Sequence, residues 1–111
     1  MNVKSPEPML FGLPAQTSER IKKIFEKNAQ VEEVILFGSR AKKNFKEGSD
    51  IDLAVKGTIS FKDFLMLRSR LDDLNLPYTI DLVQYSSIED KDVIEHIQRV
   101  GITFYKKAET R

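Results

Sequence analysis

Two aspartates one residue apart inside an apolar run constrain this chain more than any other feature. Asp50 and Asp52 lie in the run Gly48-Ser49-Asp50-Ile51-Asp52-Leu53. Side chains alternate between the two faces of a β-strand, so both carboxylates would extend from the same face. Like charges held side by side are unfavourable unless a cation lies between them. Oxygen ligands at this spacing suit Mg²⁺, and protein-bound Mg²⁺ commonly binds phosphates as well. The alternative is an edge strand with solvated acids.

A third carboxylate and a glycine–serine pair extend this pattern. Asp81 is the lone charge in the run Tyr78-Thr79-Ile80-Asp81-Leu82-Val83, which predicts another strand. If the two strands are neighbours, Asp81 can join Asp50 and Asp52. Gly38 and Ser39 follow the apolar run 34–37 and begin a predicted short helix. Glycine lets the backbone approach phosphate closely, and a helix N-terminus favours anions.

A second Asp-x-Asp, Asp90-Lys91-Asp92, is assigned differently. It lies at the start of a predicted helix, where about 100° per residue turns positions i and i+2 to nearly opposite sides. Acidic residues at that place are explained by the helix dipole. This second pair is therefore predicted to have no role in metal binding.

The order Gly38-Ser39, then Asp50-x-Asp52, then Asp81 on its own strand resembles the nucleotidyltransferase superfamily of the DNA polymerase β type. Within it, the chain is similar to the minimal nucleotidyltransferases, an antitoxin-like group that keeps only the catalytic domain. The resemblance covers about residues 18 to 105. It implies an α/β (α+β) fold with a small mixed sheet, helices mainly on one face and the metal site on the other.

The resemblance also implies roles for the site residues. The family transfers a nucleoside monophosphate, here AMP from ATP, to an acceptor hydroxyl with two Mg²⁺ ions roughly 4 Å apart. Asp50, Asp52 and Asp81 would be the catalytic and metal-binding residues, with Asp81 on the acceptor side. The nucleotide-binding residues would be Gly38, Ser39 and Arg40.

Three of these assignments leave alternatives open. Ser39 could be a plain helix N-cap instead of a phosphate ligand. Arg40 could bind the triphosphate or form a salt bridge with Glu47 or Asp50. At Lys43 the relatives often carry glycine, so the geometry of the helix end is uncertain.

Composition excludes several classes of protein. The chain has 111 residues, enough for one domain with a modest core. Its formal net charge of +1 does not predict avid nucleic-acid binding. It has no cysteine, and no apolar run approaches the ~18 residues of a membrane span. We therefore expect a cytoplasmic protein that is not inserted in a membrane; the sequence leaves open whether it forms an oligomer.

Periodicity and turn signals give the expected elements. Residues 1–16 are expected to be irregular, 17–105 to form the nucleotidyltransferase domain and 106–111 to form a polar tail. Thr17 or Ser18 would cap a helix to about residue 28, Ser60 a helix over 61–74, and Ser86 or Ser87 a last helix that ends at Gly101. Strands are expected over 34–37, 51–55, 78–84 and 102–105, with a short helix over 39–43. His96, the single histidine, is expected on a solvated face of the last helix.

The resemblance implies a partner as well. Minimal nucleotidyltransferases are often encoded beside a helical HEPN-type protein, and some adenylylate that partner. The alternative is a non-catalytic binding subunit that neutralises or complements a HEPN-type partner by contact. The presence of all three acids favours the enzyme, since a decayed site would tolerate loss of one of them.

Overall fold

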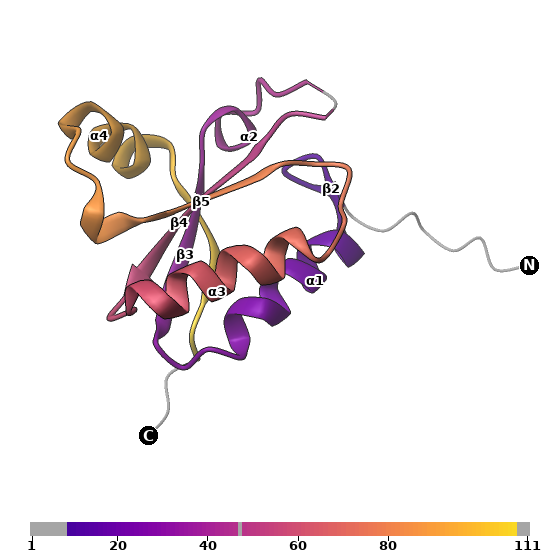
Figure 1. Ribbon diagram of the computed structural model, residues 1–111. Coiled ribbons are helices and arrows are strands. Elements are labelled where there is room, and N and C mark those ends of the chain that lie inside the picture. Colours follow the sequence, from indigo (N-terminus) through magenta and orange to yellow (C-terminus); the bar gives the residue numbers. More distant parts are fainter. Residues whose placement is uncertain (1–8, 47, 109–111) are drawn as a thin grey trace, which may run out of the picture.

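A four-stranded mixed sheet forms the centre of the computed structural model, which describes residues 9–46 and 48–108 (Figure 1). The strand order is β5-β4-β3-β6. β3 (Val31–Phe37) pairs antiparallel with β4 (Ile51–Gly57) and with β6 (Ile102–Lys106), whereas β5 (Ile80–Gln84) runs parallel to β4. This arrangement confirms the expected fold class.

The helices cover the two faces of the sheet unequally. α1 (Ala15–Glu26) and α3 (Phe61–Asp72) pack against each other on one face (Figure 1). α4 (Lys91–Val100) contacts β3 from the opposite face, and the single turn of α2 (Ser39–Lys42) follows β3. The expectation of helices mainly on one face is confirmed for α1 and α3. α4 lies over the other face, which was expected to carry the metal site.

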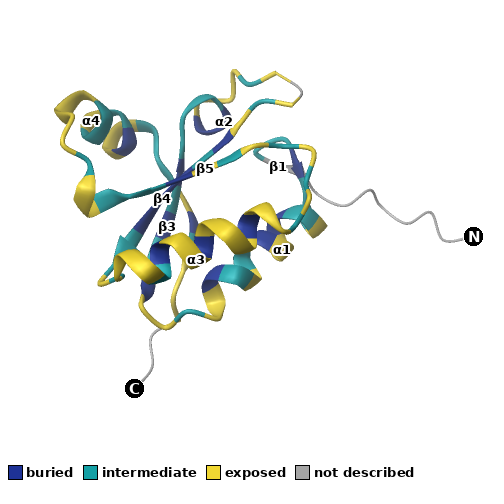
Figure 2. Ribbon diagram, in the orientation of Figure 1, coloured by how far each residue is buried: buried dark blue, intermediate teal, exposed yellow. Residues whose placement is uncertain are grey.

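The core lies between the sheet and the α1–α3 layer (Figure 2). β4 lies inside the sheet, paired on both edges, and most of its first five residues are buried. Ile51, Leu53 and Val55 on one face of this strand are buried, and Ala54 on the other face is buried as well. α3 contributes a stripe of buried residues at helical spacing: Phe64, Leu67 and Leu71.

Helix α3 begins as its sequence predicts. The side chain of Ser60 accepts a hydrogen bond of 3.1 Å from the backbone N–H of Asp63, which confirms the N-cap. Three apolar residues of α3 lie outside this buried stripe and in solvent: Phe61 is 69% exposed, Leu65 44% and Met66 40%.

The N-terminal segment differs from its prediction. β1 (Met9–Leu10) and β2 (Leu13–Pro14) pair as a short antiparallel hairpin, and the side chain of Leu13 is fully buried. α1 begins at Ala15 after Pro14, so the predicted cap at Thr17 or Ser18 is wrong. Residues 1–8 and 109–111, which belong to the expected irregular segment and polar tail, lie outside the described residues.

The start of α4 was also placed wrongly. A short 3₁₀ helix, η1 (Tyr85–Ser87), follows β5, and the cap of α4 is Asp90, whose side chain accepts from the N–H of Asp92 at 2.9 Å. The second Asp-x-Asp therefore serves the helix N-terminus, as expected. Gly101 ends α4, and the predicted edge strand follows as β6. Among residues 9–46 and 48–108, the helices are too short or too polar to cross a bilayer.

Lys43 has a backbone conformation that favours glycine. It ends α2 in the left-handed conformation, with φ of 66°, where a side chain costs roughly 1–2 kcal/mol relative to glycine. Lys43→Gly should therefore stabilise the protein by about 0.5–1 kcal/mol, since added unfolded-state freedom offsets part of the gain. Urea unfolding measures the change. Lys42→Gly, inside the helical turn, is the control and should destabilise by about the same amount; equal destabilisation by both variants would contradict the assignment.

Candidate functional site

The parallel register of β4 and β5 brings two of the predicted acids together. Asp52 pairs directly with Asp81, so their side chains leave the same face of the sheet. Asp52 is half-buried and Asp81 is exposed. Asp50 is exposed and lies one residue before β4 begins at Ile51. All three acids therefore gather at one end of the β4–β5 pair.

The charges of this cluster act on Asp52. Burial raises the pKa of Asp52 above its ordinary value, and the negative charges of Asp81 and Asp50 raise it further, while His96 opposes them. Within the described residues, no three acidic or histidine side chains form a ready-made metal cluster. An all-oxygen set whose members repel one another is nevertheless the donor chemistry that suits Mg²⁺.

At Gly38 the backbone comes very close to the acid cluster. It follows Phe37, the residue of β3 that pairs with Asp52, and has φ of 76° and ψ of −155°. This region of backbone conformation is essentially restricted to glycine. A Cβ at this position would collide with the Asp52 carboxylate. The turn therefore needs glycine both for its conformation and for the approach of Asp52.

Gly38→Ala should accordingly destabilise the protein by about 2–4 kcal/mol, the sum of backbone strain and displacement of Asp52. Gly48→Ala is a matched control, because Gly48 also has a positive φ of 82° but a Cβ there meets nothing within 4 Å. The control should show only the strain cost of about 1 kcal/mol. Urea unfolding compares the two variants. Equal losses would mean that the approach to Asp52 contributes nothing.

Ser39 is the first residue of α2, and Gly38 is the N-cap. The alternative that Ser39 is itself the N-cap is therefore wrong. Its phosphate contact remains a prediction, which its position beside the acid cluster supports.

Arg40 is a buried residue whose side chain makes several hydrogen bonds. Its side chain is 1% exposed, and its guanidinium donates to the Ser49 carbonyl at 2.8 and 3.2 Å and to the Phe11 carbonyl at 2.8 Å. The rings of Phe45 and Tyr78 each lie 5.0 Å from the guanidinium carbon. Burial lowers the pKa of Arg40, which nearby Tyr78 and Asp50 oppose.

These contacts join the N-terminal hairpin, α2 and the loop before β4. No carboxylate among the described residues forms an ion pair with Arg40, so the alternative of a salt bridge to Asp50 is not formed; Glu47 lies outside the described residues. The contact of Arg40 with a triphosphate stays a prediction. The structure itself shows its hydrogen bonds to the Ser49 and Phe11 carbonyls.

His96 is a further residue of the site, one that was not predicted from the sequence. Its Nε2 accepts a hydrogen bond of 3.1 Å from the Gly38 N–H, and its ring meets Phe37 edge to face at 6.2 Å. The predicted solvated position is therefore wrong. The available signal was helical spacing, since Val93, His96, Ile97 and Val100 lie at i, i+3, i+4 and i+7 on one face. α4 thus contacts the glycine turn through this histidine.

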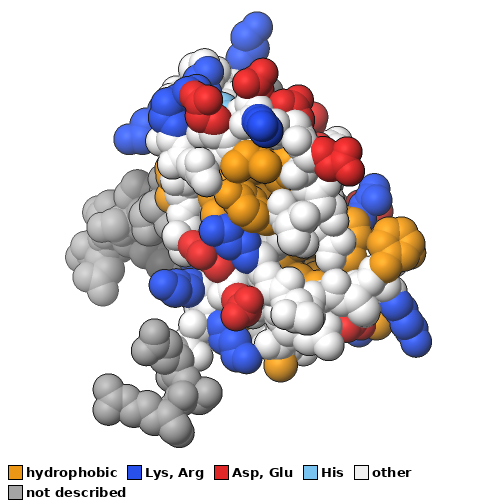
Figure 3. Space-filling model, turned by 90° about the vertical axis from the view of Figure 1, so that its left-hand side faces the viewer, with side chains coloured by type: hydrophobic (Ala, Val, Ile, Leu, Met, Phe, Trp, Pro, Cys, Tyr) orange, Lys and Arg blue, Asp and Glu red, His pale blue; other side chains and the backbone are white. Residues whose placement is uncertain are grey.

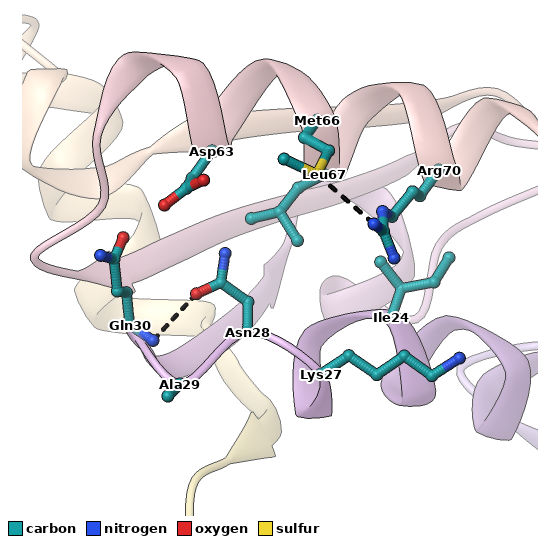
Figure 4. A pocket seen from close by; sticks show the side chains of 9 residues that line it. All are labelled: Ile24, Lys27, Asn28, Ala29, Gln30, Asp63, Met66, Leu67 and Arg70. Atoms are coloured by element: carbon teal, nitrogen blue, oxygen red, sulfur yellow. Dashed lines mark hydrogen bonds between the residues drawn. The ribbon is translucent and has the colours of Figure 1, made fainter.

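Two hollows lie on the surface of the described residues. One, of about 700 Å³, has Asp81 in its wall and lies between α3, β5 and η1. The other, of about 380 Å³, lies between α1, α3 and the loop after α1 (Figure 4). None of the predicted site residues lines the second hollow. Of these two hollows, the larger one shares Asp81 with the candidate site.

Comparisons with known proteins identify the family of this chain. The sequence model of the family described as "Polymerase beta, Nucleotidyltransferase" matches residues 19–110. No curated protein matches the chain. Among solved structures, a toxin–antitoxin complex with AMP-PNP contains a chain that is 22% identical, with a TM-score of 0.65 over 81% of this chain and 73% of that one.

Two further solved structures share the fold. A tri-AMPylated HEPN toxin of Shewanella oneidensis in complex with an MNT antitoxin gives 19% identity and a TM-score of 0.61, over 83% of this chain and 71% of the other. The toxin–antitoxin MntA-HepT gives 20% identity and a TM-score of 0.61, over 83% and 72%. The expected fold family is thereby confirmed: the chain belongs to the polymerase β nucleotidyltransferase family.

Proposed function

We propose that this protein transfers AMP from ATP to a hydroxyl of a helical HEPN-type partner protein, in a reaction that depends on Mg²⁺. The observation that carries the proposal is the register of Asp52 with Asp81, beside a glycine turn that only glycine can form. Family membership supports the class of reaction.

Asp50 and Asp52 would hold Mg²⁺ jointly, and Asp81 would hold it on the acceptor side. The metal would neutralise phosphate charge and orient the reacting oxygens. The acids themselves position the metal, and Asp81 accepts the proton of the attacking hydroxyl. Gly38 and Ser39 receive the triphosphate at the N-terminus of α2, where backbone N–H groups favour an anion.

Two solved relatives support the choice of nucleotide and partner. One is a toxin–antitoxin complex that contains AMP-PNP, an ATP analogue. The other is a complex of an MNT antitoxin with a HEPN toxin that carries AMP groups. We infer the same kind of nucleotide and the same kind of partner for this chain.

Binding of ATP tests the proposal. Calorimetry with Mg²⁺ should detect ATP binding, and Asp81→Asn should abolish transfer while leaving the melting temperature unchanged or higher, because Asp81 is exposed and repelled by Asp52. Asp92→Asn, in the second Asp-x-Asp, is the control and should retain transfer. An Asp81→Asn protein that unfolds would show instead that Asp81 is a structural residue.

A further inference from the structure

The hollow beside Asp81 has a composition that points to one class of occupant. It lies where the outer edge of the sheet, β5, meets α3 on one face and η1 and α4 on the other. This side of the molecule faces the viewer in Figure 3, where apolar side chains gather in the middle of the face and charged side chains surround them. We call this hollow the β5 groove.

The floor of the β5 groove is the edge of a strand. Within residues 9–46 and 48–108, β5 has β4 as its one neighbour, and Leu82, Val83 and Gln84 line the groove. An edge strand offers N–H and C=O groups that can pair with an extended polypeptide. Asp81 stands at the start of the same strand, so a chain added along β5 would pass directly by it.

The walls of the groove are mostly apolar. They include Phe61, Phe64 and Ile88, and Phe61 is 69% exposed. Large exposed aromatic residues are typical anchors of protein interfaces. The groove lining has one cation, Arg68. A nucleic-acid backbone needs several cations along its path, so this lining favours a polypeptide.

Arg68 adds charge specificity. Its guanidinium carbon lies 6.0 Å from the centre of the Phe64 ring, and the single ion pair found in the described part of the chain joins Arg99 and Glu95 instead. Arg68 is thus available to an acidic side chain of an incoming segment. Asp81, the other charged residue of the lining, would repel such a side chain. The two charges together would orient an acidic segment along the groove.

We propose that the β5 groove binds an extended acceptor segment of the partner polypeptide as an additional strand on β5. Its apolar side chains enter the groove at Phe61 and Phe64, its acidic side chain meets Arg68, and its hydroxyl lies at Asp81. This inference rests on the proposed function. The hydroxyl oxygen attacks the α-phosphorus of ATP, its proton passes to Asp81, and the bond to the β-phosphate breaks as pyrophosphate leaves with the electron pair.

The test uses the full chain and an array of synthetic twelve-residue peptides that each contain one Tyr, Ser or Thr. The peptides that bind should contain, besides the hydroxyl residue, apolar residues at alternate positions and one acidic residue. Fluorescence anisotropy then measures the affinity of the tightest peptide. Phe61→Ser should weaken binding about tenfold or more. Leu65→Ser, on an exposed part of the same helix outside the groove, should change it less than about twofold.

Charge and backbone variants sharpen the assignment. Arg68→Glu should weaken binding of the acidic peptide. Arg70→Glu should leave the affinity unchanged, because Arg70 lines the separate hollow of Figure 4. N-methylation of alternate peptide amides should abolish binding in one register and spare it in the other, because every second N–H of an added strand faces β5. Equal effects of both methylation patterns would overturn strand addition.

Other outcomes separate this inference from the proposed function. ATP binding without binding of any peptide would overturn the groove assignment alone. Peptide binding that Phe61→Ser weakens, without ATP binding, would support the groove and refute the proposed function. A loss of ATP affinity in Phe61→Ser would assign the groove to the nucleotide base. A dimer that Phe61→Ser dissociates would assign it to a second copy of this chain.

Discussion

Asp52→Asn is expected to reduce nucleotidyl transfer by at least about a hundredfold while making the metal-free protein more stable. Transfer is lost because Asp52 is the central acid of the site, paired with Asp81 and preceded by Asp50. Stability rises because the amide removes a half-buried charge that two neighbouring carboxylates repel. Catalysis therefore favours aspartate at this position, whereas the stability of the metal-free protein favours asparagine.

The pH dependence of this gain has a defined sign. The pKa of Asp52 in the folded protein is raised above its ordinary value of 3.8, chiefly by burial and next by Asp81 and Asp50. The folded state thus binds more protons than the unfolded state between the two pKa values, and stability falls as pH rises through that window. The advantage of Asp52→Asn should be complete above the folded pKa and disappear below 3.8.

Urea unfolding of both proteins at neutral pH and near pH 3.5 measures this difference in the absence of divalent metal. Asp92→Asn again provides the control, since Asp92 belongs to the N-terminus of α4 and should gain no stability. Lower stability of Asp52→Asn at neutral pH would show that the carboxylate makes a favourable contact in the metal-free protein.

Arg40→Ala should destabilise the protein by about 3–5 kcal/mol, a large part of the stability of a domain of this size. The substitution removes three charge-assisted hydrogen bonds to the carbonyls of Ser49 and Phe11. It also leaves a cavity between the rings of Phe45 and Tyr78. Arg40→Lys should recover only part of the loss, because an ammonium group cannot reproduce the planar donors and ring contacts of the guanidinium.

Thermal and urea unfolding test this prediction, with Arg70→Ala as the control. Arg70 is exposed, and its one side-chain hydrogen bond within the described residues is to Met66 Sδ at 3.4 Å. The control should change stability by less than about 0.5 kcal/mol. If Arg40→Ala keeps its stability and loses ATP affinity, the arginine acts mainly on the nucleotide.

The sequence predicted the parts of the fold that local patterns determine. Alternation of apolar residues identified β4, and Ser60 identified the start of α3. Asp52 and Asp81 could be placed together because each was a lone charge in an apolar strand. Their pairing depends only on which two strands are neighbours, and the family resemblance supplied that information.

Contacts between distant segments could not be predicted in the same way. Arg40 reaches carbonyl groups of the N-terminal hairpin and of the loop before β4, and neither partner has a distinctive side chain. His96 lies 58 residues from Gly38 along the chain. Leu13 follows Gly12 and precedes Pro14, residues typical of irregular structure, yet tertiary packing buries it completely. In each case long-range packing decided what local propensity could not.

The most direct test of the central claim is to co-express this chain with the product of the neighbouring gene, the proposed partner, and to examine that product by mass spectrometry. The proposed function predicts that the partner gains AMP with the wild-type chain and none with Asp52→Asn, although both chains bind it. A stable complex in which the partner never gains AMP, and which Asp52→Asn leaves unchanged, would contradict enzymatic transfer and favour a binding subunit that acts by contact.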